Sequence, residues 1–209
     1  MFGAEEAGAF LETRFAELVE EGYRTKALDT FRARALMSRD KLDEAKPILE
    51  GVLERYGEDK WTHYYLANIG EQMDRPDDVE HHLRACLKIE PDDPDVLNFL
   101  GYYLADKNMK LDEAEDLVER ALELDPENGY YLDSLGWVYY RQGNGEDAVD
   151  YIERALLNMP SDDAILRDHL GDAYLMVGDS DRAVQQWRRA RRLDPELEGV
   201  VEKINQYTE

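Results

Sequence analysis

The sequence predicts an all-α protein, a solenoid of antiparallel helix pairs stacked along the chain. Apolar residues recur at spacings of three and four within short segments, which places them on one face of an α-helix. The same pattern then returns every 34 or 35 residues, from starts at Lys26, Lys60, Pro94, Gly129 and Ala164. A helix pair of this length cannot bury its apolar side alone, so we expect neighbouring copies to cover it.

The segment 129–163 is representative of the repeat. Its first half carries leucine and tyrosine on one helical face, and the Gly-Asn-Gly sequence at 143–145 marks a turn. The second half places Ala148 and Ala155 on one face and is stopped by Pro160. This order predicts a helical hairpin.

Small residues occur where the two helices of a hairpin must cross. Three successive repeats place a glycine in the first helix and an alanine in the second: Gly101 with Ala114, Gly136 with Ala148, and Gly171 with Ala183. A glycine has no Cβ, so two helices can approach closely there. We expect these positions to set the packing of the hairpins.

The pattern resembles the tetratricopeptide-repeat (TPR) family over about residues 26–195. The last repeat shows it in Leu170-Gly171, Tyr174, Ala183 and the exit proline Pro195. The resemblance implies a right-handed superhelical solenoid with five repeats, at 26–59, 60–93, 94–128, 129–163 and 164–197. Residues 1–25 are expected to form a helix that is either a cap or the remnant of a preceding repeat, and residues 198–209 a capping helix.

Composition narrows the possible partners. With 48 acidic and 25 basic residues the chain carries a net charge of −23, which disfavours binding to nucleic acid. This charge favours basic peptides as partners, or it serves solubility alone. No apolar run is long enough to span a bilayer and no signal peptide is visible, so we expect a cytoplasmic protein without membrane insertion. A periplasmic or lipid-anchored location is the alternative if an N-terminal segment is missing.

Residue patterns typical of catalysis or metal binding are absent from the sequence. None of the four histidines pairs with another at a spacing of four, and Ser134 lacks the glycine-bounded turn of a catalytic nucleophile. The acidic loops after the prolines are better explained as helix N-caps than as calcium ligands. We therefore predict no enzymatic activity, no metal and no cofactor.

The TPR resemblance implies that the first helix of each repeat lines a concave groove that holds an extended peptide or a partner helix. In this groove we expect Asn68 and Asn98 to hold the main chain of the ligand and Trp137 to anchor an aromatic or apolar side chain. Tyr64 and Tyr102 fit the groove and packing between repeats equally well. The full set of predicted groove residues is Arg34, Tyr64, Asn68, Asn98, Tyr102, Asp133, Trp137, Tyr140, Arg141, Asp168 and Asp172.

The nature of the ligand follows from the side chains in this set. Asp133, Asp168 and Asp172 suggest a ligand with Lys or Arg near the C-terminal half of the groove, and Trp137 suggests an aromatic or apolar anchor beside it. A known subclass of the family clamps a C-terminal carboxylate with Lys-x-x-x-Asn and Lys-x-x-x-Arg. Here the first of these slots hold Thr30 and Arg34, so that mode is disfavoured.

The leading hypothesis is a non-enzymatic adaptor that binds a protein or peptide. One alternative is a self-assembling module that forms homo-oligomers through its N-terminal helix, where Phe2 and Phe10 are left partly uncovered. Another is a part of a larger bacterial envelope or secretion-assembly protein. That last alternative rests on the style of the repeats alone.

Overall fold

A computed structural model describes residues 10, 13–15, 17–19 and 21–208, and every regular element there is an α-helix. The predicted all-α class is confirmed. Contacts between residues divide the chain into two compact units, Met1–Pro91 (unit 1) and Asp92–Glu209 (unit 2), where the sequence predicted one undivided array. Each unit is described by itself.

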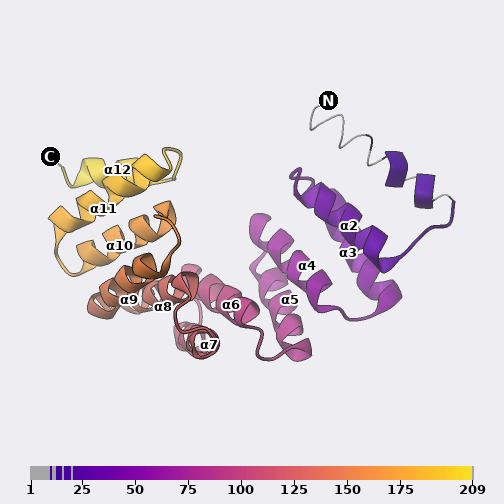
Figure 1. Ribbon diagram of the computed structural model, residues 1–209, viewed down its shortest axis with the longest axis horizontal. Coiled ribbons are helices and arrows are strands. Elements are labelled where there is room, and N and C mark those ends of the chain that lie inside the picture. The colour runs from indigo at the N-terminus through magenta and orange to yellow at the C-terminus, as the bar shows by residue number, and fades with distance from the viewer. Residues whose placement is uncertain (1–9, 11–12, 16, 20, 209) are drawn as a thin grey trace. The chain divides into compact units, whose positions relative to one another are not determined.

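The described residues of unit 1 from 26 onward form two helical hairpins. Within unit 1 α2 packs against α3 and α4 against α5 (Figure 1). Leu36 and Leu49 are fully buried between the helices of the first hairpin, and Leu66 and Ile69 extend this core into the second. The helices are α2 (Lys26–Met37), α3 (Leu42–Tyr56), α4 (Lys60–Gln72) and α5 (Pro76–Ile89).

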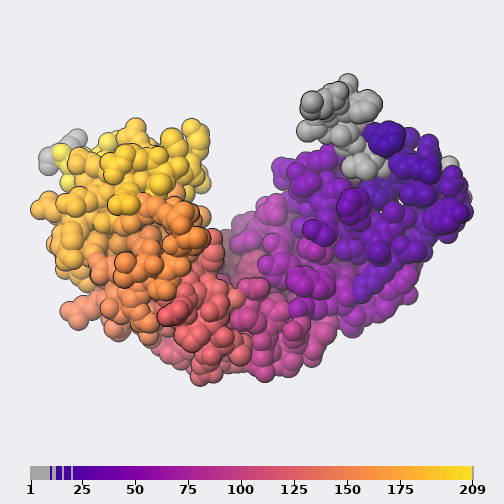
Figure 2. All heavy atoms as spheres, in the orientation of Figure 1, coloured from indigo at the N-terminus to yellow at the C-terminus, as the bar shows by residue number. Residues whose placement is uncertain are grey.

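Unit 2 contains three hairpins and a short final helix. Its helices pack without a break from α6 to α12, coloured pink to yellow in Figure 2. Val200 and Ile204 of the final helix are buried against the last hairpin, as expected of a capping helix. The helices are α6 (Pro94–Asp106), α7 (Leu111–Leu124), α8 (Gly129–Gln142), α9 (Gly145–Asn158), α10 (Ala164–Met176), α11 (Ser180–Leu193) and α12 (Val200–Gln206).

Polar side chains begin the first helix of successive hairpins. Asp93, Asn128 and Asp163 each accept hydrogen bonds from backbone N–H groups of the following turn, at 2.8–3.4 Å. These groups would otherwise lack a partner, so the caps favour starting the helix at that residue. The interpretation of the acidic loops as N-caps is therefore confirmed for these three.

The predicted helix crossings are also present. A Cβ added to Gly136 would lie 2.5 Å from Ile152 Cγ1, and one added to Gly101 would lie 2.5 Å from Val118 Cγ2. A Cβ at Gly171 would meet the Trp187 ring. Because real Cβ atoms do not approach other heavy atoms this closely, the Ile152 side chain or the two helices would have to shift to accept even an alanine at position 136.

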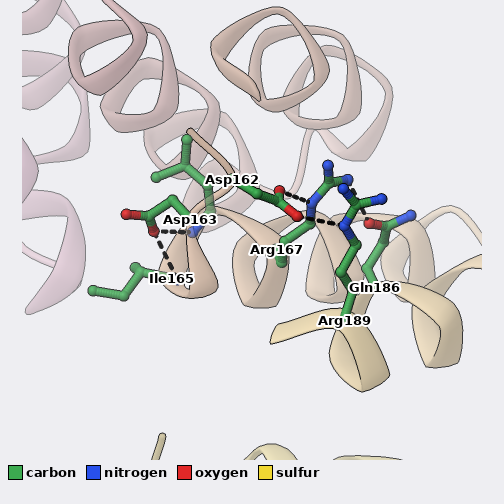
Figure 3. Close-up of polar contacts among 7 residues, drawn as sticks. Asp162, Asp163, Ile165, Arg167, Gln186 and Arg189 are labelled. Atoms are coloured by element: carbon green, nitrogen blue, oxygen red, sulfur yellow. Dashed lines mark hydrogen bonds and ion pairs between the residues drawn. The ribbon is translucent and has the colours of Figure 1, made fainter. Parts of the chain in front are cut away.

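The loop that leads into α10 is fastened to α11. Asp162 turns toward Arg167 and Arg189, whereas its neighbour Asp163 turns the other way to cap α10 (Figure 3). Arg167 continues this network to Gln186 of α11 with a hydrogen bond of 2.9 Å. Burial acts to raise the pKa of Asp162, but the hydrogen bonds from the two arginines outweigh it and hold the pKa below its ordinary value. The start of α10 is thereby fixed relative to α11.

The ends of the chain are partly described. Phe15 is 5% exposed, and its ring centre lies 5.7 Å from that of Phe31 in α2. Phe10 is exposed, as predicted, whereas Phe2 lies outside the described residues. No helix in the described part of the chain has both the length and the apolar character needed to cross a membrane.

Enlarging Ala155 tests the packing between hairpins. This fully buried residue belongs to one core cluster with Leu132 and Leu166, so Ala155→Phe should lower the free energy of unfolding by roughly 1–3 kcal/mol or more through overpacking. Urea unfolding followed by circular dichroism measures the change. The control is Leu157→Phe in the same helix, where the side chain is 85% exposed and we expect little effect. Equal effects of the two substitutions would show that the assigned register is wrong.

Candidate functional site

The candidate site in unit 2 is a hollow of about 300 Å³ between the first helices of three hairpins. Its wall combines aromatic and aliphatic side chains with a few polar groups. We call it the unit 2 hollow. Its lining residues are Asn98, Phe99 and Tyr102 of α6, Tyr130, Asp133 and Ser134 of α8, and Asp163, Ile165, Leu166 and His169 at and beyond the N-terminus of α10.

A buried Asp–His pair forms part of the wall. His169 Nδ1 lies 3.0 and 3.2 Å from the two carboxylate oxygens of Asp133, and both residues are nearly inaccessible to solvent. Burial alone would lower the pKa of His169, but the charge and hydrogen bond of Asp133, helped by Asp168 and Asp172, raise it above its ordinary value. The pair therefore holds α8 and α10 in a fixed register at the hollow.

Trp137 lies inside the wall behind this pair. It is 7% exposed, and its ring stacks against His169 at 4.2 Å and against Tyr140 at 4.7 Å between ring centres. The prediction that Trp137 is an open anchor for a ligand is therefore corrected, because the imidazole from the next hairpin covers its face. The buried Trp137 Nε1 has no hydrogen-bond partner among the described residues.

Asp168 and Asp172 are also engaged within the protein. Lys203 of α12 places its Nζ 2.9 Å from both carboxylate oxygens of Asp168 and 2.7 Å from Asp172 Oδ2. Asp172 also accepts a hydrogen bond from Trp187 Nε1 at 3.0 Å. The expectation that these aspartates are open to a basic ligand is corrected, since the final helix supplies the cation itself.

Three other predicted groove residues in unit 2 differ in their surroundings. Asn98 and Tyr102 line the hollow, and Asn98 Oδ1 is buried without a hydrogen-bond partner in the described part of the chain. Arg141 lies outside the hollow, where its Nη2 donates to the Asp106 carbonyl at 3.0 Å. The side-chain acceptor of Asn98 is therefore left without a donor from the described residues.

The remaining predicted residues belong to unit 1. The Asn68 amide donates to the Tyr64 carbonyl of its own helix at 2.8 Å, and the Tyr64 ring packs edge-on to Trp61. Arg34 lies over the Tyr65 ring, with its guanidinium carbon 5.4 Å from the ring centre. Among the eleven predicted residues, the unit 2 hollow brings together Asn98, Tyr102 and Asp133.

His169 is a site residue that sequence reasoning missed. It lies 36 residues, about one repeat, after Asp133. Two other hydrogen bonds join residues about one repeat apart. The Tyr131 hydroxyl donates to Asp95 at 2.6 Å over 36 residues, and Arg141 donates to the Asp106 carbonyl over 35 residues. Searching for complementary side chains one repeat apart would have found the pair. Its burial could not be read from one repeat alone.

The residue types of a Ser–His–Asp triad meet in this hollow, but their hydrogen bonds differ from those of a triad. Ser134 Oγ donates to the Tyr130 carbonyl of its own helix at 2.9 Å. A nucleophile activated by His169 would instead have to hydrogen-bond the imidazole. Asp133 orients the ring through Nδ1, as the carboxylate of a triad does, but the hydrogen bond of Ser134 goes to its own helix and not to the imidazole.

These features define a class of protein built from repeated helical hairpins whose first helices line a common hollow. Comparison with known proteins agrees: the tetratricopeptide-repeat family model matches residues 104–165. Over 82 residues, 39% of this chain, the sequence is 33% identical to a TPR repeat-containing protein of Pseudomonas aeruginosa. That alignment spans 14% of the length of the Pseudomonas protein. The matched segment, residues 104–165, therefore has the sequence pattern of tetratricopeptide repeats.

Solved structures share the fold. The crystal structure of PilW, a widely conserved type IV pilus biogenesis factor, is similar with a TM-score of 0.74 at 18% identity, covering 87% of this chain and 90% of that one. A thermophilic TPR protein of Thermus thermophilus is similar with a TM-score of 0.70 at 18% identity, covering 88% of this chain and 98% of that one. At these identities the similarity concerns the fold alone.

Replacing Asp133 tests the buried pair. In Asp133→Asn the imidazole stays buried but loses its carboxylate, so we expect the pKa of His169 to fall below the ordinary value of about 6.5. Histidine proton shifts in an NMR titration measure it. Because the folded-state pKa is raised in the wild type, the stability from this pair is fully present below about pH 6.5 and is lost as the pH rises through the folded-state pKa. A His169 pKa that is the same in both proteins is inconsistent with the assigned hydrogen bond.

Proposed function

We propose that unit 2 binds an extended peptide segment of a partner protein in its hollow. The tetratricopeptide-repeat fold supports a role as a scaffold for protein–protein interactions, and the hollow gives that role a location. Tyr130 and Ile165 are 56% and 50% exposed at its rim, where a large apolar side chain of the peptide would be held. No step of chemistry is part of this proposal.

The observation that carries the proposal is the unpartnered Asn98 Oδ1 in the same hollow as these exposed side chains. A buried acceptor without a donor costs about 1–3 kcal/mol, and a peptide N–H supplies that donor. Exposed tyrosine provides contact area at a low cost in conformational entropy. The rigid Asp133–His169 pair keeps the wall in place before the ligand arrives, which reduces the free-energy cost of binding.

A displayed library of random peptides, selected on the full chain, tests the proposal. Among the selected peptides we expect a group whose affinity falls about tenfold in Tyr130→Ala, because the substitution removes a large aromatic contact at the rim of the hollow. Asn98→Ala should weaken the same group. The matched control is Leu157→Ala, an exposed apolar side chain on α9, which should leave the affinity unchanged.

Two results would overturn the proposal. One is a selection in which no peptide depends on Tyr130 or Asn98. The other is equal loss of binding in Leu157→Ala, which would indicate non-specific adhesion to exposed apolar side chains. Circular dichroism of each variant separates lost binding from lost folding.

Self-assembly is the second candidate, favoured by the exposed Phe10 near the N-terminus. In that case sedimentation should depend on concentration and the dependence should disappear after removal of residues 1–22. A part in envelope or secretion assembly is a third candidate. The fold that this chain shares with PilW, a type IV pilus biogenesis factor, supports this candidate.

A further inference from the structure

Unit 1 has a hollow of its own, with a different lining. An open concavity of about 590 Å³ lies between α2 and the start of α4, and we call it the unit 1 hollow. Two large aromatic residues stand exposed at its edge, Phe31 at 54% and Trp61 at 55%. Exposed aromatic rings beside a concavity are the side chains that most often anchor a protein partner. The lining is completed by Lys26, Ala27, Thr30, Arg34, Asp59 and Tyr65.

The charged side chains in this hollow differ in whether they have an ion-pair partner. Lys26 and Asp59 form an ion pair with each other, and Thr62 also donates to Asp59. Arg34 has no carboxylate within 4 Å in the described part of the chain, and its guanidinium lies over the Tyr65 ring. In a chain with 48 acidic and 25 basic residues, an arginine without an acidic partner beside aromatic rings favours an anionic ligand.

A second polar group in the hollow lacks a partner. Thr30 Oγ1 is buried and makes no hydrogen bond with the described residues, although Thr30 lines the hollow. A hydroxyl can donate to a peptide carbonyl or accept from a peptide N–H. The unit 1 hollow therefore has an aromatic ring, a cation and a hydroxyl on neighbouring turns of α2, and a second exposed aromatic ring, that of Trp61, on α4.

We infer that the unit 1 hollow binds an acidic and aromatic peptide segment of a partner protein. A large aromatic or aliphatic side chain lies between Phe31 and Trp61, and an Asp or Glu carboxylate pairs with Arg34. Phe31 and Arg34 are three residues apart on α2, so their side chains lie about 5–6 Å apart at Cβ. Side chains two residues apart on one face of an extended peptide have a similar separation, about 6.5–7 Å. This ligand has the opposite charge to the basic one that the sequence predicts.

The proposal concerns a surface separate from the unit 2 hollow, and different variants test the two. The peptide library is selected on the full chain, and the selected peptides are then sorted by their loss of binding in Trp61→Ala. We expect this group to be enriched in Asp or Glu within two or three residues of an aromatic or large aliphatic residue. Peptides that depend on Tyr130 should keep their affinity in Trp61→Ala.

The ion pair is tested with one synthetic peptide from the Trp61-dependent group, acetylated and amidated so that it has no terminal charges. Replacing its acidic residue by the amide should weaken binding about two- to fivefold, the range for a partly exposed pair. In Arg34→Gln that difference should vanish. Arg188→Gln on α11 is the control, since it removes the same charge from an exposed position in unit 2. A change in tryptophan fluorescence on binding reports on Trp61, because Trp61 is exposed at the hollow whereas Trp137 and Trp187 are buried.

Several results would overturn the inference. These are the absence of any Trp61-dependent peptide, enrichment of Lys or Arg in that group, and equal effects of Arg34→Gln and Arg188→Gln on binding of the acidic peptide. Strong dependence of binding on a free C-terminal carboxylate would equally contradict it, because the ligand group would then be the chain end. If the selection yields Trp61-dependent peptides but no Tyr130-dependent peptides, the unit 2 proposal is wrong. The inference about the unit 1 hollow is then unaffected.

Discussion

The close approach of two helices at a glycine is the constraint on which the rest of the structure depends. At Gly101, Gly136 and Gly171 the neighbouring helix comes so near that a Cβ would overlap with its side chains. This approach fixes the rotation of each first helix about its axis. Since that rotation decides which side chains face the next hairpin and which face solvent, the crossing also places the residues of the unit 2 hollow.

The second constraint is the repetition of contacts at a spacing of one repeat. Asp133 with His169, Asp95 with Tyr131, and the Asp106 carbonyl with Arg141 all join equivalent parts of successive hairpins. Each contact gives a polar group on the first helices a hydrogen-bond partner within the protein. Fewer polar groups on that face are therefore available to a ligand. The acidic composition therefore has a structural use, because aspartates cap helices and hold neighbouring hairpins together.

Sequence reasoning predicted the features that depend on local pattern. The helix starts at Asp93, Asn128 and Asp163 follow from capping chemistry, and the crossing at Gly136 follows from the small residues at a fixed spacing. It did not predict the surroundings of Trp137, because the ring that covers it belongs to the next hairpin. Asp168 and Asp172 were misjudged for a similar reason, since their cation comes from α12, beyond the last repeat.

A double-mutant cycle on Gly136 and Ile152 tests the central constraint most directly. Alanine has a higher helix propensity than glycine by about 1 kcal/mol, so Gly136→Ala would stabilise an unconstrained helix. We expect the substitution to destabilise the protein instead, and to do so by at least about 1 kcal/mol less in the Ile152→Ala background, where the overlapping Cγ1 is gone. Urea unfolding of the four proteins gives the coupling free energy. A coupling of zero, or a Gly136→Ala protein more stable than the wild type, would contradict this account.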